Sequence, residues 1–266
     1  MSNFLANATP PAENRMTLFG KFKAALQEVN IDLEAIVETH GFFLEQQKQD
    51  PELRIPTYRA KIPAGGGRAF DIITGDDDLD TSIPSFRGVI ATFHSSNALF
   101  EDGESGPDTN NPPICQSPDG VQGVHGNTGE ITLCADCKHN QWGSDQKGGR
   151  GKDCKNMRRL YVLVEGSSIP IVMTMPPTSI RPWEAYKASL AVQRKAPQDV
   201  VTEFSLTTEK NAAGTAYSVV KFKAAGLLST EARLTVKALG SGESYSKDLN
   251  GDDYNVAEPQ VADTGE

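Results

Sequence analysis

The chain contains four cysteines, and all of them lie between Cys115 and Cys154 with the spacing C-x18-C-x2-C-x16-C. Cys134 and Cys137 form a C-x-x-C pair, a tight turn that can direct two thiolates at one ion. The other two cysteines flank this pair and can complete a tetrahedron. Zn²⁺ favours thiolates in tetrahedral sites, and four protein ligands leave no position for a reacting water. The spacing therefore predicts a structural zinc site with Cys115, Cys134, Cys137 and Cys154 as ligands.

A redox C-x-x-C pair, two disulfides and unreactive packed thiols are the competing interpretations. A thioredoxin-like pair belongs in a βαβ pattern, whereas Gly, Asn, Asp and Lys surround this one. Residues 1–15 contain no apolar core of a secretory signal, which argues against an oxidising compartment and so against disulfides. His125 and His139 could each replace one cysteine as a ligand, although a histidine in a polar loop is more often solvated.

The charges of the chain are separated along its length. The net charge of −9 argues against a nucleic-acid partner, but residues 241–266 contribute seven acidic residues and one basic residue to it. Residues 134–159 instead contain seven basic and three acidic residues. With 38% hydrophobic residues, and no apolar run near the roughly 20 residues of a membrane span, the chain reads as a soluble protein without membrane contact. The distribution predicts a basic cysteine segment and an acidic tail.

Hydrophobic periodicity divides the 266 residues into four segments. Residues 1–16 are polar and predicted to be disordered, and residues 17–50 show helical spacing up to about residue 48. Residues 51–240 form the main domain, with a helix that Thr178 or Ser179 caps and that ends near Gln193. Residues 241–266 are predicted to be a disordered acidic tail. The main domain shows strand patterns at residues 54–62, 69–73, 86–93, 159–164, 169–175, 200–207 and 216–223.

Short strands, Gly/Pro turns and the lack of βαβ alternation indicate a β-rich α+β domain. We expect an OB-like small barrel with a zinc-binding loop, residues 114–158, inserted between strands. Residues 227–239 are expected to close this domain before the tail.

Strand alternation suggests which face would contact a ligand. Residues 216–223 place Tyr217, Lys221 and Lys223 on one face, and residues 158–164 place Arg159 and Tyr161 on the face opposite the core. Aromatic and cationic side chains together suit stacked bases beside phosphates, although exposed Tyr and Lys are common on any half-buried sheet. The candidate nucleic-acid-binding residues are Trp142, Lys147, Arg150, Lys152, Arg159, Tyr161, Tyr217, Lys221 and Lys223.

Signatures of catalysis are absent from the sequence. It contains no G-x-S-x-G, H-E-x-x-H or P-C-x-x-C motif, and its four histidines form no spaced pair. The glycine-rich residues 147–152 lack the P-loop lysine and Ser or Thr. The acidic run from Asp76 to Asp80 invites a nuclease hypothesis, but it lacks the spacing of a calcium loop and reads as a solvated loop. We expect a non-catalytic protein without a small-molecule substrate.

Several motifs of the chain are similar to those of one known family. They are Cys134-Ala135-Asp136-Cys137, Asn140-Gln141-Trp142-Gly143-Ser144, Lys152-Asp153-Cys154-Lys155-Asn156, the strand 159–163, and Pro176-Pro177-Thr178-Ser179 followed by Trp183 and Tyr186. Over residues 86–225 the chain resembles bacteriophage single-stranded DNA-binding proteins of the replication and recombination type. The resemblance implies an OB-like fold, a zinc knuckle in some members, and an acidic tail that recruits replication partners. The tail here ends Asp263-Thr264-Gly265-Glu266, without the family's terminal aromatic residue.

The sequence thus favours a protein that coats single-stranded DNA during phage-type replication or recombination, in the cytoplasm of an infected bacterial host. Its partners would be single-stranded DNA and, through the tail, replication or recombination proteins. The alternative is a zinc-stabilised protein-interaction module, such as a phage factor that binds a host polymerase or nuclease.

Overall fold

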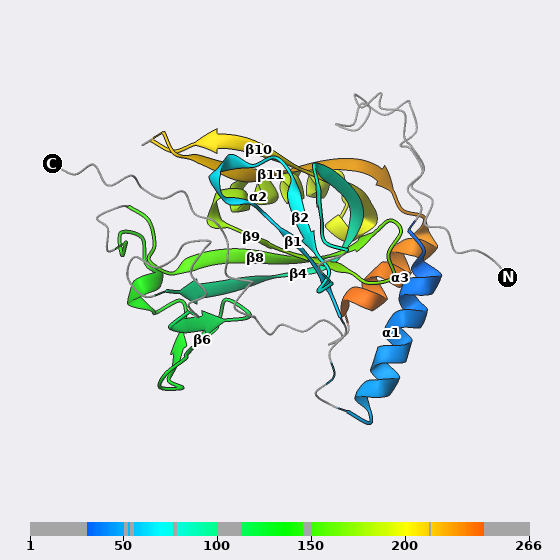
Figure 1. The fold of residues 1–266 in the computed structure, drawn as a ribbon, viewed down its shortest axis with the longest axis horizontal. Coiled ribbons are helices and arrows are strands. Elements are labelled where there is room, and N and C mark those ends of the chain that lie inside the picture. Colours follow the sequence, from blue (N-terminus) through cyan, green and yellow to red (C-terminus); the bar gives the residue numbers. More distant parts are fainter. Residues whose placement is uncertain are drawn as a thin grey trace.

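The computed structural model of the chain describes residues 31–50, 53, 56–76, 79–100, 113–145, 150–212 and 214–241. These residues form three α-helices and an 11-stranded sheet (Figure 1). The helices are α1 (Leu33–Gln47), α2 (Pro177–Val192) and α3 (Thr230–Ser241). The strands are β1 (Tyr58–Lys61), β2 (Phe70–Ile73), β3 (Thr81–Ile83), β4 (Ser85–Leu99), β5 (Cys115–Ser117), β6 (Gln122–His125), β7 (Ile131–Leu133), β8 (Lys155–Val164), β9 (Ile171–Met175), β10 (Val200–Lys210) and β11 (Ala216–Leu227). Short 3₁₀ turns are η2 (Ala64–Gly66), η3 (Lys138–Asn140) and η4 (Pro197–Asp199).

The 15-residue strand β4 organises the sheet. One of its edges pairs with β8 from Gly88 to Ala98, with a β-bulge between Ile90 and Thr92. The other edge pairs first with β10 and then, from Asn97 to Leu99, with β5. The strand order is therefore β3-β2-β1-β9-β8-β4-β5-β6-β7, with β10 and β11 branching from the first half of β4. The small strands β5–β7 lie at the end of the sheet far from α1 and α3 (Figure 1).

Helix α2 covers one face of the sheet. The stripe of Trp183, Tyr186 and Leu190 that predicted this helix is buried in the larger core, which confirms the periodicity. The predicted cap is wrong, because the helix begins at Pro177, a residue type well suited to the first helical position. Ser179 lies inside the helix instead, and its Oγ accepts a hydrogen bond of 3.0 Å from the main-chain N–H of Val220.

Helices α1 and α3 cover the opposite face. Ile36 of α1 and Val236 of α3 belong to a second buried cluster that includes Tyr161 and Leu163 of β8. The predicted helical segment 17–50 is confirmed for residues 33–47, where Asp32 caps the N-terminus, while its first part lies outside the described residues. No helix in the described ranges is long and apolar enough to cross a membrane.

The main domain is β-rich, as expected, but its sheet does not close into a barrel through main-chain pairing. A side chain spans part of the gap instead: the single hydroxyl proton of Ser218 on β11 is shared between the main-chain oxygens of Pro63 and Gly67, which lie 2.9 and 2.8 Å from Oγ. Residues 114–158, expected as a loop, contain β5, β6, β7 and η3. We call residues 113–145 and 150–154 the cysteine module. The segment predicted to close the domain forms α3.

Candidate metal centre and the basic surface beside it

Strand pairing brings two distant cysteines to the same end of β4. Cys115 opens β5 and lies opposite Leu99 in the register. Cys154 directly precedes β8, whose Lys155 lies opposite Ala98 on the other edge of β4. Cys115 and Cys154 therefore flank the last residue of β4, although 38 residues separate them in the chain.

The C-x-x-C pair reaches this point from the β6–β7 hairpin. Cys134 follows β7, and its main-chain N–H donates to Val121 O at 2.8 Å. Cys137 caps η3, whose Asn140 N–H donates to Cys137 O at 3.0 Å. Cys154 N–H donates to His139 O at 2.8 Å, which joins the knuckle to the start of β8.

All four cysteines line one small cavity, with Gly123 and Asn140 among its other residues. Its volume is about 20 Å³, and about 10–15 Å³ is enough for one water-sized particle. A Cβ added to Gly123 would lie 2.8 Å from Cys115 Sγ and 3.8 Å from Cys134 Sγ, so only glycine leaves this space open. None of the four thiols forms a disulfide.

The sulfurs do not have the geometry of a completed metal site. In the described part of the chain, no group of three or more His, Cys, Asp or Glu side chains is arranged to hold a metal ion. A bound ion would have to draw the four thiols inward toward the shared cavity. The donor set nevertheless fits zinc, because four thiols around one small space match its preference for sulfur and tetrahedral closure.

The electrostatics of the cavity depend on whether a cation is present. Burial, and then the charge of the neighbouring cysteine thiolates, raises the pKa of Cys154 to about 12. The same two causes raise the pKa of Cys115. The metal-free cluster therefore keeps these thiols protonated, whereas a coordinated divalent cation deprotonates its thiol ligands and reverses this balance.

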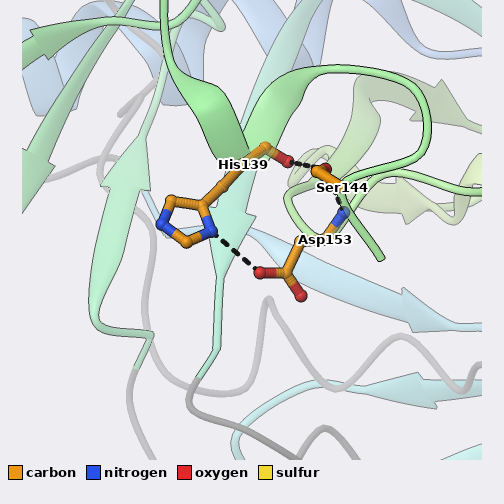
Figure 2. A network of polar contacts seen from close by, with 3 residues as sticks. All are labelled: His139, Ser144 and Asp153. Atoms are coloured by element: carbon orange, nitrogen blue, oxygen red, sulfur yellow. Dashed lines mark hydrogen bonds and ion pairs between the residues drawn. The ribbon is translucent and has the colours of Figure 1, made fainter. Parts of the chain in front are cut away.

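The two candidate histidine ligands differ in their surroundings. His139 Nδ1 pairs with Asp153 Oδ2 at 2.9 Å, and Ser144 Oγ donates to the main-chain oxygen of His139 at 2.8 Å (Figure 2). Ser144 does not touch the imidazole, so the trio braces the loop and is not arranged to activate a nucleophile. His125 faces Cys115 across the β5–β6 ladder, and its buried Nδ1 has no hydrogen-bond partner among the described residues. His125 is thus the better placed of the two to contact a metal-bound thiolate.

Three asparagines connect the cysteine module to the sheet. Asn140 Nδ2 donates to Cys134 O at 2.7 Å, and Asn140 Oδ1 accepts from Asn156 Nδ2 at 2.8 Å. Asn156 Nδ2 also donates to Asn97 Oδ1 of β4 at 2.9 Å. These hydrogen bonds therefore fix the position of the knuckle relative to both β4 and β8.

The module exposes an aromatic ring and places a half-buried lysine beside it. Trp142 is 80% exposed, and Lys152 Nζ lies 5.6 Å from the centroid of its ring. Arg150 is exposed nearby in the sequence. Lys147 lies outside the described residues. Trp142 does not cover the cysteines, so its exposed ring has no role in the core.

The prediction that Tyr161 and Arg159 form an accessible face is wrong in this structure. The two side chains share a face, but Tyr161 is 1% and Arg159 5% exposed. Tyr161 belongs to the cluster beneath α1 and α3, and the Arg159 guanidinium lies 5.7 Å from its ring. A base cannot stack on Tyr161 without displacing its cover.

Tyr217, Lys221 and Lys223 share one face of β11, as predicted, but this face is not electropositive. Lys221 Nζ lies 3.4 Å from Glu209 Oε1, and Lys223 Nζ lies 3.4 Å from Glu203 Oε2 on the paired strand β10. The hydroxyl of Tyr217 donates to Glu209 Oε2 at 3.4 Å. These glutamates could have been found by pairing the two strand patterns across the turn at residues 211–215.

The alternation argument missed Arg158. It lies opposite Ser95 and Met175 in the ladders, on the face that β8 presents to α2 and to the cysteine cavity. It is half-buried, Nη1 donates to Met157 O at 2.9 Å, and no carboxylate of the described residues pairs with it. The sequence pattern assigned this face to the core, but β8 extends past the core at its first residues, where the same face meets the module.

The acidic run of the nuclease hypothesis braces a turn. Asp80 Oδ1 accepts from Thr74 N at 2.7 Å and from Thr74 Oγ1 at 3.0 Å. Asp77 and Asp78 lie outside the described residues. The contacts of Asp80 favour the solvated-loop interpretation.

Comparison with known proteins adds no relative of this chain, because no protein-family model, curated protein or solved structure matches it. The resemblance to phage single-stranded DNA-binding proteins therefore stays a prediction. The function has to be argued from the chemistry of the cysteine module and the surface it carries.

Proposed function

We propose that this protein is a non-catalytic, zinc-stabilised protein that binds and coats single-stranded DNA in phage-type replication or recombination. The observation that carries the proposal is the cysteine module, in which four thiols surround one cavity and the same short segment holds Trp142 and Lys152 at the surface. An exposed, cation-flanked aromatic ring is the arrangement on which bases stack without sequence preference.

The connectivity of the sheet supports an OB-like core within this proposal. Five strands run in the order β9-β8-β4-β10-β11, β4 pairs with both β8 and β10, and α2 connects β9 to β10. OB-folds are partly open barrels that bind oligonucleotides on their second and third strands and on the loops after the first and fourth strands. Counting β4 as the first strand, those loops are the cysteine module and the tip of the β10–β11 hairpin. Both project toward the same end of the sheet (Figure 1).

Zinc would act structurally. Cys115, Cys134, Cys137 and Cys154 would hold it with no open position, and the ion would fix the two flanks of the module to the end of β4. The ion would supply folding energy to the module and no reaction.

The proposed DNA contacts follow from exposure and free charge. Trp142 would stack a base, while Arg150, Lys152 and Arg158 would meet phosphates on the surface between the module and α2. Tyr217, Lys221 and Lys223 would contribute only when phosphates displace Glu203 and Glu209, because exposed ion pairs are worth about 0–1 kcal/mol. Lys147 keeps its predicted phosphate role. The acidic residues 241–266 would bind replication partners.

Titration of fluorescent oligo(dT), duplex DNA and single-stranded RNA tests the proposal. The full chain and a chain ending at Ser241 should be compared at two salt concentrations, with zinc content measured by elemental analysis. We expect one zinc per chain, micromolar or tighter affinity for oligo(dT), and affinity that falls steeply with salt. Absent or salt-independent binding by both chains would remove the proposal.

A second candidate, a zinc-stabilised protein-interaction module, is favoured by one observation. Val124, Ile131 and Leu133 are exposed on the β6–β7 hairpin, and β7 is an edge strand of the sheet. Exposed apolar side chains on an edge strand suit the addition of a partner strand. If the variant Ile131→Ser kept its affinity for oligo(dT) and lost a stoichiometric protein partner, both functions would be present. Loss of a protein partner without any DNA affinity would leave the interaction module alone.

A further inference from the structure

Asn140 lies between the cysteine knuckle and Lys152, the half-buried lysine beside the exposed Trp142 ring, and it forms hydrogen bonds to the knuckle and to Lys152. Its main-chain N–H donates to Cys137 O at 3.0 Å. Its side-chain Nδ2 donates to Cys134 O at 2.7 Å. The two cysteines of the C-x-x-C pair are thus both held by one residue, through their carbonyl oxygens.

The side-chain oxygen of Asn140 makes the opposite connection. It accepts from Lys152 Nζ at 3.2 Å and from Asn156 Nδ2 at 2.8 Å, which uses both acceptor positions of an amide oxygen. Lys152 Nζ, held in this way, lies 5.6 Å from the centroid of the Trp142 ring. A short chain of contacts therefore runs from the knuckle carbonyls through Asn140 and Lys152 to Trp142.

The geometry of this series of contacts depends on where the main-chain carbonyls of Cys134 and Cys137 lie. An ion that draws the sulfurs of Cys134 and Cys137 toward one point also fixes the peptide groups whose oxygens Asn140 contacts. Without the ion, these peptide groups would be held only by the hydrogen bonds of the knuckle, and the side chain of Asn140 would be freer to move. A ring that is held in place before binding loses less conformational entropy when a base stacks on it.

We infer that Asn140 is a positioning residue through which metal binding at the four cysteines sets the Trp142–Lys152 pair and so raises affinity for single-stranded DNA. The inference rests on the proposed function. It goes further in making zinc a regulator of DNA affinity rather than only a support for the fold. Because coupling is reciprocal, oligo(dT) must raise the zinc affinity by the same factor by which zinc raises the oligo(dT) affinity.

Two neighbouring truncations separate this role from simple support of the knuckle. Gln141 also donates to the knuckle, from Nε2 to Ala135 O at 2.8 Å and to Cys137 O at 3.4 Å, but within the described part of the chain it forms no hydrogen bond with Lys152. Asn140→Ala removes both halves of the connection, whereas Gln141→Ala removes knuckle contacts alone. Lys152→Met keeps the hydrogen bonds of Asn140 to the knuckle and breaks the connection to Trp142. It also removes a proposed phosphate contact, so its readout is the zinc-dependent gain in oligo(dT) affinity rather than the affinity itself, and it carries the test if Asn140→Ala does not fold.

Three quantities should be measured on the full-length chain, with and without zinc. They are the zinc affinity against a chromogenic chelator, the oligo(dT) affinity, and the time-resolved fluorescence anisotropy of tryptophan. Trp183 is fully buried and gives a constant background, so the zinc-dependent part of the anisotropy reports on the exposed Trp142.

In the wild-type chain and in Gln141→Ala, zinc should raise the oligo(dT) affinity about 10-fold, within the usual range of coupling, and slow the motion of Trp142. In Asn140→Ala and Lys152→Met the gain should fall below about 2-fold and Trp142 should stay mobile, while Lys152→Met keeps the wild-type zinc affinity. A wild-type gain in both variants would overturn the coupling and leave the proposed function standing. A wild-type chain that binds no zinc or no oligo(dT) would overturn the proposed function and the coupling with it.

Discussion

Raising the pH should destabilise the metal-free protein through Cys154. This side chain is 8% exposed, and burial followed by the neighbouring thiolates raises its pKa from the ordinary 9.0 to about 12. Its folded pKa lies above its unfolded value, so its contribution to stability is full below pH 9 and is lost as the pH rises toward 12.

The size of the effect follows from the two pKa values. At pH 10 the unfolded thiol is mostly ionised and the folded thiol is not, which costs about 1 kcal/mol of unfolding free energy. The full difference of about three pKa units corresponds to about 4 kcal/mol, reached only near pH 12. At about pH 8 the effect is negligible.

Urea denaturation at about pH 8 and about pH 10 measures this loss when a chelator and a phosphine reductant are present. Lysines and tyrosines also titrate in this range, so the quantity of interest is the difference between the wild-type chain and Cys154→Ser, whose hydroxyl does not ionise. We expect the wild-type chain to lose about 1 kcal/mol more than the variant.

Zinc should abolish the difference, because a coordinated Cys154 is already a thiolate at neutral pH. The zinc-loaded chain should instead lose metal as the pH falls and protons compete for the sulfurs. Equal losses in the metal-free wild type and Cys154→Ser would refute the reasoning, since they would show that the Cys154 thiol ionises as freely in the folded chain as in the unfolded one.

Three further outcomes follow from individual contacts. Gly240→Ala should lower the unfolding free energy by about 1–3 kcal/mol in urea, because an added Cβ would overlap with the main-chain oxygen of Ala91 and push α3 off β4. Ser179→Ala should cost about 1–3 kcal/mol in the same assay, since the buried N–H of Val220 would lose its acceptor; a change below about 0.5 kcal/mol, the lower end of the usual net contribution of a hydrogen bond, would contradict this. Trp142→Ala should weaken oligo(dT) binding about 10-fold in a fluorescence titration and leave the melting temperature unchanged, because in the proposed function the ring would stack a base, and it is exposed rather than packed in the core. An unchanged affinity would exclude Trp142 from the DNA surface.

Local patterns predicted the elements of the fold well. Alternation located the strands that became β2, β8, β9, β10 and β11, and a helical stripe located α2. These signals succeed because each depends on which residues of one segment face the core. The predicted cap of α2 is wrong because serine is a common N-cap residue, whereas the hydroxyl of Ser179 accepts a hydrogen bond from the main-chain N–H of Val220 in β11.

Exposure was harder to predict than alternation. The alternation in β8 correctly places Tyr161 and Leu160 on opposite faces of the sheet. It does not indicate that α1 and α3, which are far from β8 in the sequence, cover the face of Tyr161. The prediction of a basic face on β11 is wrong for a related reason, because Glu203 and Glu209 on β10 balance the charges of its two lysines. In both cases the deciding partner lies on a different helix or strand, which the pattern of one segment alone does not include.

The convergence of the cysteines followed from their spacing, but the way it is achieved did not. Nothing in the C-x18-C-x2-C-x16-C pattern indicates that Cys115 and Cys154 would lie on opposite edges of the same strand. The role of Asn140 was equally hidden, because its connections run to main-chain oxygens and to a lysine in a segment of no regular structure.

The continuity of β4 has a mechanical consequence. A single strand, with one β-bulge between Ile90 and Thr92, runs from its pairing with β10 at Ser85 to its pairing with β5 at Leu99, and β8 pairs with it along most of that length. A strand rises about 3.3 Å per residue, so β4 is roughly 50 Å long. One end of it packs in the core and the other end carries the cysteine module. A module joined by a flexible linker would reorient independently of the core. A module paired to the same strand as the core must tumble together with it. NMR relaxation should accordingly give one rotational correlation time for both, and a force applied at the module would be borne by the backbone ladder of the core.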